Sequence, residues 1–216
     1  IAQFSSFKKA KLHQPKKTTN TRMEEIPKEW PTAVVERYQP IQKLGKGAFG
    51  SVLLANPKKK NDPDSNSNFV AIKIVGGSTP SERGYARREI YILQQLQHSN
   101  MVRLLESYES SLREEKSHIA MILSYAKGPT LESLLRQGGG APSIVFGRVI
   151  CAQLIDVVSF LHSHAVIHRD IKPDNMIISG ISSKHDIWSE EGDEKDDDDE
   201  PLWDELLKRW HLTLID

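Results

Sequence analysis

The stretch from His168 to Asn175 concentrates polar groups of several chemical kinds between two apolar segments. Asp170 can orient a hydroxyl group and accept its proton, and Lys172 can neutralise charge that develops on a transferred phosphoryl group. Asn175 offers a neutral oxygen ligand of the hard kind that Mg²⁺ prefers. Pro173 lacks a backbone N–H and disfavours helix at Lys172, so we expect an irregular loop. A solvated polar turn is the alternative for any one residue, but the ordered set favours a catalytic loop.

A glycine-rich stretch near residue 45 is a second candidate site. Residues 38–44 alternate as a half-buried strand does, and residues 51–55 predict another strand. Between them, Gly45, Gly47 and Gly50 would let the backbone approach a polyphosphate and bind its oxygens through N–H groups. The same glycine spacing occurs in dinucleotide-binding turns, but there a helix follows the glycines. A strand follows here, so the pattern favours a hairpin that covers phosphates.

A helix is predicted from Pro80 to about Leu96. Thr79 is a suitable N-cap, Pro80 suits the first helical position, and Glu82 completes a capping box. One face of this helix is apolar and carries a single acidic residue, Glu89. The other residues of that face are Ala86, Ile90 and Leu93. We therefore expect Glu89 to be buried and to need a cation.

Lys73 is the cation that the sequence offers. It interrupts the apolar strand predicted at residues 69–75, where an unpaired amine would be costly to bury. Pairing Lys73 with Glu89 would explain both charged residues together. A lysine on an edge strand that faces solvent is the alternative.

These motifs together resemble those of the eukaryotic protein kinases, and Lys172 after Asp170 resembles their serine/threonine branch. The resemblance implies an α+β bilobal fold, with a complete small-lobe β-sheet and one helix, followed by a truncated helical large lobe. It implies transfer of the γ-phosphoryl group of ATP, with Mg²⁺, to a serine or threonine hydroxyl of a protein substrate. The implied domains are a small lobe at 37–123 and, at 124–216, the hinge with part of the large lobe.

The resemblance also assigns roles to residues. Asp170 would act as the base with Lys172 on the γ-phosphate, while Lys73, held by Glu89, would align the α- and β-phosphates. Asn175 and Asp216 would be the Mg²⁺ ligands, although the Phe and Gly that kinases place after this aspartate do not follow here. The implied nucleotide-binding residues are Leu44, Gly45, Gly47, Gly50, Val52, Ala71, Lys73, Leu123, Ser124 and Ala126. Ser124 and Ala126 would bind the adenine edge through their backbones, and kinases often have an acidic residue at the Ser124 position.

A long apolar helix is predicted from Pro142 to about His164 as the floor of the catalytic loop. Arg148, Gln153 and Asp156 interrupt its apolar sequence, so no membrane span is expected. Cys151, the only cysteine, is expected to be buried in this helix, and it excludes an internal disulfide framework. His168 is expected to be a satisfied structural histidine.

Charge is balanced overall but unevenly distributed. Lys plus Arg and Asp plus Glu each number 29, which predicts no attraction to nucleic acid or to a membrane. Residues 1–36 are basic and predict a disordered tail, with a nuclear-import patch as the sharper alternative. Residues 182–208 form an acidic insert, which predicts a solvated loop, or else a docking site for a basic partner. The spacing of tryptophan and leucine after Pro201 predicts a short amphipathic helix. No signal peptide is apparent, and we expect an intracellular protein, cytoplasmic or nuclear.

The chain starts at Ile1 and stops at Asp216 inside a predicted strand, so we expect a fragment that is poorly stable and inactive alone. Two alternatives to an active protein kinase remain open. A pseudokinase or ATP-binding scaffold is disfavoured because it would not need Asp170. A small-molecule kinase of related fold is disfavoured by Arg169 and by the Lys172–Pro173 pair.

Overall fold

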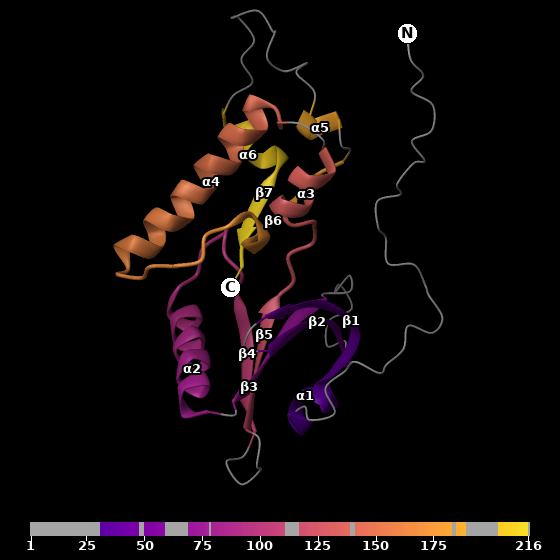
Figure 1. Ribbon diagram of the computed structural model, residues 1–216, viewed down its shortest axis with the longest axis vertical. Coiled ribbons are helices and arrows are strands. Elements are labelled where there is room, and N and C mark those ends of the chain that lie inside the picture. The colour runs from indigo at the N-terminus through magenta and orange to yellow at the C-terminus, as the bar shows by residue number, and fades with distance from the viewer. Residues whose placement is uncertain are drawn as a thin grey trace, which may run out of the picture.

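A computed structural model describes residues 31–47, 50–58, 69–77, 79–110, 117–138, 141–182, 185–188 and 203–215. The chain forms one lobe built on a β-sheet, called the small lobe, and a second, mainly helical lobe, called the large lobe, with β7 running toward the boundary between them (Figure 1). The predicted α+β bilobal architecture is confirmed.

The small lobe contains a five-stranded antiparallel sheet in the order β1-β2-β3-β5-β4. Its strands are β1 (Tyr38–Gly47), β2 (Gly50–Pro57), β3 (Val70–Gly77), β4 (Leu104–Glu109) and β5 (Ser117–Ser124). Because successive side chains in a strand point to opposite faces, each strand contributes to two apolar layers. Leu53, Ile72 and Ile122 face one layer, whereas Val75, Met121 and Leu123 face the other.

A short helix, α1 (Thr32–Arg37), covers the first of these faces. Val34 is fully buried there against the sheet, next to Tyr38. Arg37 Nη2 lies 2.8 Å from Glu106 Oε1 in β4, so the helix is tied to the far edge of the sheet. The disordered tail was predicted to run to residue 36, but its last residues belong to α1. A short helix with one buried valine gives no periodic signal in the sequence. Residues 1–30 lie outside the described residues.

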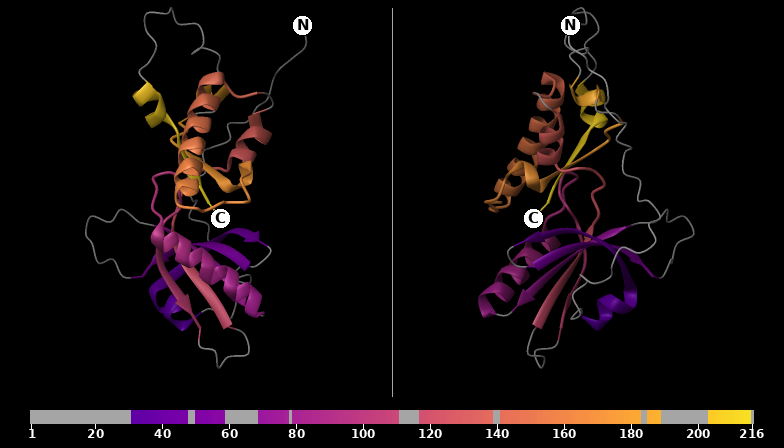
Figure 2. Two further views of the ribbon diagram at one scale, coloured as in Figure 1. Left: turned by 90° about the vertical axis from the view of Figure 1, so that its left-hand side faces the viewer. Right: turned by 45° about the vertical axis from the view of Figure 1, so that its right-hand side comes forward.

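The opposite face of the sheet is covered by α2 (Pro80–Gln95), as both views in Figure 2 show. The predicted capping box is present: Glu82 N–H donates to Thr79 Oγ1 at 3.2 Å, and Thr79 N–H donates to Glu82 Oε2 at 3.0 Å. These two bonds satisfy backbone donors that the first turn of a helix leaves free.

The main helix of the large lobe is α4 (Ile144–Ser163), whose N-cap is Ser143. Its other described elements are α3 (Leu131–Gly138), the 3-10 turn η2 (Pro173–Asn175), β6 (Met176–Ser179), α5 (His185–Trp188), α6 (Trp203–Arg209) and β7 (His211–Leu214). β6 and β7 pair as an antiparallel hairpin. The core of this lobe joins α4 to both strands of the hairpin and also takes in Leu96, just beyond α2.

α4 is the predicted core helix of the large lobe. Among the described residues, it is also one helix that is long and apolar enough to cross a membrane, although Arg148, Gln153 and Asp156 were expected to exclude this. Its buried face, which includes Phe146 and Val149, packs in the core of the large lobe, and a core helix meets the same length and composition criteria. Cys151 is exposed rather than buried, because it lies on the side of the helix away from that core.

The insert is anchored by structured flanks, so a solvated loop is the wrong description for them. Ile187 in α5 is buried in the large-lobe core, and its carbonyl accepts the N–H of Ser143 at 2.8 Å. The predicted amphipathic helix after Pro201 is present as α6, and Trp210 just beyond it packs edge-on against Phe146. The acidic residues 189–200 lie outside the described residues.

Candidate active site

The predicted catalytic loop begins at a defined helix end. Ala165 follows α4 with φ 58°, and the N–H of Val166 donates to the Leu161 carbonyl at 3.0 Å. The N–H of Ala165 donates to the His162 carbonyl at 3.0 Å, which completes a Schellman motif. Arg169 also has a positive φ, of 70°. The left-handed turn at Ala165 ends α4 and directs the chain away from its axis toward Asp170.

Asp170 is held by two neighbours in the loop. Lys172 Nζ lies 2.7 Å from Asp170 Oδ2 and 3.0 Å from Oδ1, and Asn175 Nδ2 donates to Asp170 Oδ2 at 2.9 Å. The hydrogen bond from Lys172, and next that from Asn175, hold the pKa of Asp170 below its ordinary value because both stabilise the carboxylate. The Asp170 side chain is 53% exposed, so the carboxylate is fixed in direction yet open to a substrate.

Asn175 is buried at the end of η2 and joins the catalytic loop to β7. Its Nδ2 also donates to the Asp170 carbonyl at 2.9 Å, and its own carbonyl accepts the N–H of Ile215 at 2.9 Å. With the amide nitrogen committed to Asp170, the amide oxygen is the group that can face a cation, so the residue fits a magnesium ligand. Asp216, the other predicted ligand, follows Ile215 directly but lies outside the described residues.

No cluster of three or more histidine, cysteine, aspartate or glutamate side chains that could hold a metal ion occurs among the described residues. The predicted Mg²⁺ site does not require one, since it combines one amide, one carboxylate and oxygens of the nucleotide. The chemistry of the donor set therefore fits magnesium rather than a transition metal.

Lys73 and Glu89 form the predicted ion pair. Lys73 Nζ donates to Glu89 Oε1 at 2.9 Å and to Oε2 at 3.1 Å, from the middle of β3 to the underside of α2. Their side chains are 19% and 29% exposed, so the pair is partly rather than fully buried. Two charged groups that would each be costly in an apolar layer satisfy one another there.

The predicted nucleotide-binding residues of β2, β3 and β5 share one face of the sheet. Val52 is directly opposite Lys73, and Ala71 is directly opposite Leu123. Directly opposed residues in an antiparallel pair point to the same side, as do residues two apart in a strand. All four side chains therefore lie on the face that also carries the Lys73–Glu89 pair.

The glycines of the first hairpin have different surroundings. A β-carbon on Gly50 would lie 1.7 Å from the carbonyl oxygen of Ile74, so a glycine is required there for the close approach of β2 to β3. A β-carbon on Gly45 would meet nothing within 4 Å, which leaves open space beside the strand. Gly47 is paired with Gly50 at the end of β1, and Leu44 is 40% exposed.

The segment that joins the lobes begins at Ser124. Its backbone N–H donates to the Arg103 carbonyl at 2.8 Å, and its Oγ accepts the N–H of Arg103 at 2.9 Å. The N–H of Ser124 is thus committed within the protein, and any adenine contact by Ser124 would have to use its carbonyl. Ala126, two residues on, is partly buried.

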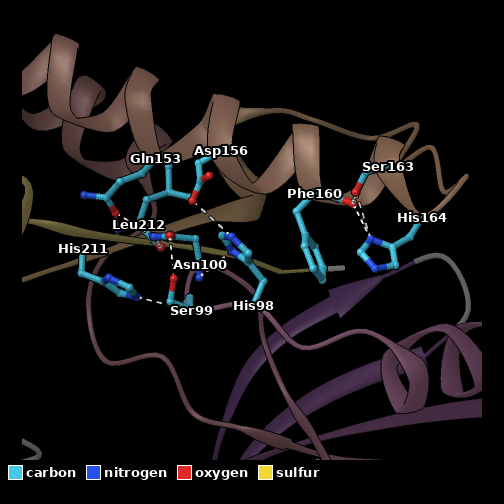
Figure 3. A network of polar contacts seen from close by, with 10 residues as sticks. All are labelled: His98, Ser99, Asn100, Gln153, Asp156, Phe160, Ser163, His164, His211 and Leu212. Carbon is cyan, nitrogen blue, oxygen red and sulfur yellow. Dashed lines mark hydrogen bonds and ion pairs between the residues drawn. The ribbon is translucent and has the colours of Figure 1, made fainter.

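A buried polar network behind the site was not predicted as a functional feature. Asn100 Nδ2 donates to Gln153 Oε1 at 2.8 Å and to the Leu212 carbonyl at 2.7 Å, and Leu212 N–H donates to Gln153 Oε1 at 2.8 Å (Figure 3). His98 Nε2 lies 3.2 Å from Asp156 beside it. The network ties the segment after α2 to α4 and β7. Gln153, between apolar residues of α4, was the available signal, because a buried amide needs partners.

His168 is partly buried, and its Nδ1 accepts the N–H of Asp170 at 3.3 Å. This bond helps to shape the loop and agrees with a structural role.

Residues 38–188 match the family described as "Protein kinase domain". The chain belongs to the protein kinase family. This match covers the small lobe, the catalytic loop and the beginning of the insert, which includes every described residue to which the sequence analysis gave a catalytic or binding role.

Several relatives are named as serine/threonine-protein kinases. The chain is 31% identical over 147 residues to "Serine/threonine-protein kinase 36" of Pongo abelii, covering 67% of this chain and 10% of that protein. It is 33% identical over 147 residues to "Cyclin-dependent kinase-like 4" of Mus musculus, covering 67% of this chain and 40% of the relative. The chain therefore spans well under half the length of these relatives.

The fold is shared with a solved kinase structure. A crystal structure of Rad53 residues 1–466 in complex with AMP-PNP superimposes with a TM-score of 0.58 and 24% sequence identity, covering 85% of this chain and 38% of that one. The similarity supports the bilobal kinase fold.

Proposed function

We propose that this chain carries the nucleotide-binding and proton-accepting parts of an ATP-dependent serine/threonine protein kinase. The observation that carries the proposal is the joint presence of two arrangements in one kinase-family chain. Lys73 is paired with Glu89, and the Asp170 carboxylate is held between Lys172 and Asn175. When bound, ATP with Mg²⁺ would supply the phosphoryl group and neutralise part of its charge.

The small lobe would bind and align the nucleotide. Gly45, Gly47 and Gly50 would cover the phosphates, and Val52, Ala71 and Leu123 would line the adenine site together with Leu44 and the backbone of Ser124 and Ala126. Lys73 would contact the α- and β-phosphates, because Glu89 holds its ammonium group on the inner face of the sheet.

The large lobe would handle the acceptor hydroxyl. Asp170 remains ionised at neutral pH, since its neighbours lower its pKa, and so it can accept a hydrogen bond from a hydroxyl and then its proton. A carboxylate of low pKa is a weak base, which favours a role in orienting the hydroxyl while the proton leaves late. Lys172 would face charge on the transferred group, and Asn175 and Asp216 would ligate Mg²⁺.

A transfer assay tests this proposal in the full-length parent protein. With labelled ATP and Mg²⁺, label should appear on serine or threonine of an acceptor protein and not on a panel of small alcohols. Label on a small alcohol alone would indicate a small-molecule kinase. Binding of the nucleotide without transfer to any acceptor would indicate a pseudokinase or ATP-binding scaffold.

A basic partner for the acidic insert and an intracellular location stay predictions. Deletion of residues 189–200 tests the first: unchanged activity and unchanged partner binding would leave only a solvated loop. Imaging of the tagged parent protein tests the second.

A further inference from the structure

Among the described residues, α2 makes at least two ion pairs with the sheet, and one of these two belongs to the candidate active site. Glu89 pairs with Lys73 in β3. Two residues earlier, Arg87 donates from Nε to Glu109 Oε2 at 3.2 Å and from Nη2 to Glu109 Oε1 at 2.5 Å. Glu109 ends β4, an edge strand of the sheet. A guanidinium that binds both oxygens of one carboxylate fixes direction as well as distance.

Apolar packing holds α2 only lightly. Among its 16 residues, Ala86 alone is buried; Ile90 and Leu93 are partly buried against the sheet, and Ile92 is partly buried against the large-lobe core. The first two turns therefore contribute a single small side chain to the apolar layer beneath them. The rotation of this helix about its axis must depend in part on its polar contacts with the sheet.

The two pairs are well placed to fix that rotation. Helical residues two apart are separated by about 200° around the axis and about 3 Å along it. On the sheet, Lys73 is opposite Met121, which is opposite Ser107, and Glu109 lies two residues further along β4. Lys73 and Glu109 are therefore two strand spacings apart, which is about 10 Å measured across the sheet. Attachment at two separated points resists a rolling motion that one pair would permit.

We propose that Arg87 and Glu109 are positioning residues that hold α2 in the rotation at which Glu89 reaches Lys73. β4, the strand that carries Glu109, is also held on the opposite face of the sheet, where Arg37 Nη2 lies 2.8 Å from Glu106 Oε1. The consequence for nucleotide binding rests on the proposed function, whereas the consequence for the helix does not.

The solvent exposure of the Arg87–Glu109 pair determines how much its loss should weaken nucleotide binding. The side chains of Arg87 and Glu109 are 54% and 34% exposed, and ion pairs near the surface are weak because water screens them. We expect loss of the pair to weaken nucleotide binding about two- to five-fold, and to leave the fold intact.

Four variants of the full-length parent protein test the proposal: Arg87→Glu, Glu109→Arg, the two together, and Arg88→Glu as a matched control on an exposed neighbour. Affinity for Mg²⁺–AMP-PNP is measured by calorimetry, and amide hydrogen exchange is measured across residues 80–95. Each single reversal in the pair should weaken binding two- to five-fold and speed exchange, and the double reversal should restore both. Arg88→Glu should change neither.

The same substitution in a Glu89→Ala background shows whether Arg87 affects nucleotide affinity through the position of Glu89 or by another route. If Arg87 acts through Glu89, Arg87→Glu should cause no further loss of nucleotide affinity in that background. An equal loss with and without Glu89, or failure of the double reversal to restore exchange, would overturn the proposal. If the unmodified full-length protein binds no nucleotide, the proposed function fails, and hydrogen exchange alone decides whether the pair positions α2.

Discussion

The carboxylate of Asp170 shows how single contacts set the chemistry of a residue. Lys172 and Asn175 both donate hydrogen bonds to it, and these two bonds are the largest causes of its lowered pKa. Because the folded-state pKa lies below the unfolded value, these contacts stabilise the fold above the unfolded pKa. That stabilisation is lost as the pH falls through the folded pKa.

Replacing Lys172 should therefore raise the pKa of Asp170. In Lys172→Met, the carboxylate loses its nearest cation, and the pKa should move up toward the ordinary value of about 4. NMR titration of the ¹³C-labelled side-chain carboxyl measures the shift directly, with the exposed Lys127→Met as control. An unchanged pKa in Lys172→Met would show that Lys172 does not hold the carboxylate in solution.

Among the elements, the end of α4 offers a sharp test of backbone strain. Ala165 adopts the left-handed conformation, which costs a residue with a side chain roughly 1–2 kcal/mol and costs glycine little. Allowing for the greater freedom of glycine in the unfolded chain, Ala165→Gly should stabilise the protein by about 0.5–1 kcal/mol. Urea unfolding measures the free energy of unfolding of the variant and the parent chain.

The control for Ala165→Gly is the same substitution in the middle of the helix. Ala152 is exposed in α4, and Ala152→Gly should destabilise by about 1 kcal/mol, because glycine disfavours helix interiors. A loss of stability at both positions would contradict the account of the helix end.

Elements with strong local signals were predictable from the sequence. Capping residues and periodic apolar faces located α2 and α4, and glycines between alternating segments located the first hairpin. Elements that depend on tertiary packing were not. Nothing local marks α1 or α5, because each is ordered by one or two side chains, Val34 or Ile187, buried against distant strands or helices.

The same limit explains the residues that were misplaced. Cys151 was predicted to be buried because α4 is apolar on several sides, as the exposed Ile144 and Ile155 also show. Periodicity cannot identify the core face of such a helix. The Lys73–Glu89 pair was predictable because each charge stood alone in an apolar pattern, whereas the partners of Asp170 required the loop geometry.

At the scale of the whole molecule, the two lobes share a polar link as well as a chain connection. Asn100 follows α2 in the small lobe but donates to Gln153 and Leu212 in the large lobe, and its carbonyl accepts the N–H of Leu214 at 2.8 Å. Leu96 packs in the large-lobe core in the same segment. Because residues 96–100 directly follow α2, their contacts with the large lobe help to set the position of this helix.

Asn100→Ala should therefore lower the free energy of unfolding of both lobes together. It leaves the buried carbonyl of Leu212 without the donor that Asn100 provides, at a cost of about 1–3 kcal/mol. The urea midpoint should fall equally when followed by tryptophan fluorescence and by far-UV circular dichroism, and exposed Gln94→Ala should leave it unchanged. A fall seen by one probe only would mean that the lobes unfold separately.

The central claim is that the small lobe binds the nucleotide while Asp170 serves the acceptor hydroxyl, and one substitution tests it most directly. In the full-length parent, Asp170→Asn keeps the size of the side chain and removes its charge. Phosphoryl transfer should fall at least about a thousand-fold, while the affinity for Mg²⁺–ATP should change less than about three-fold. Retained transfer, or a loss of nucleotide affinity as large as the loss of turnover, would contradict the claim.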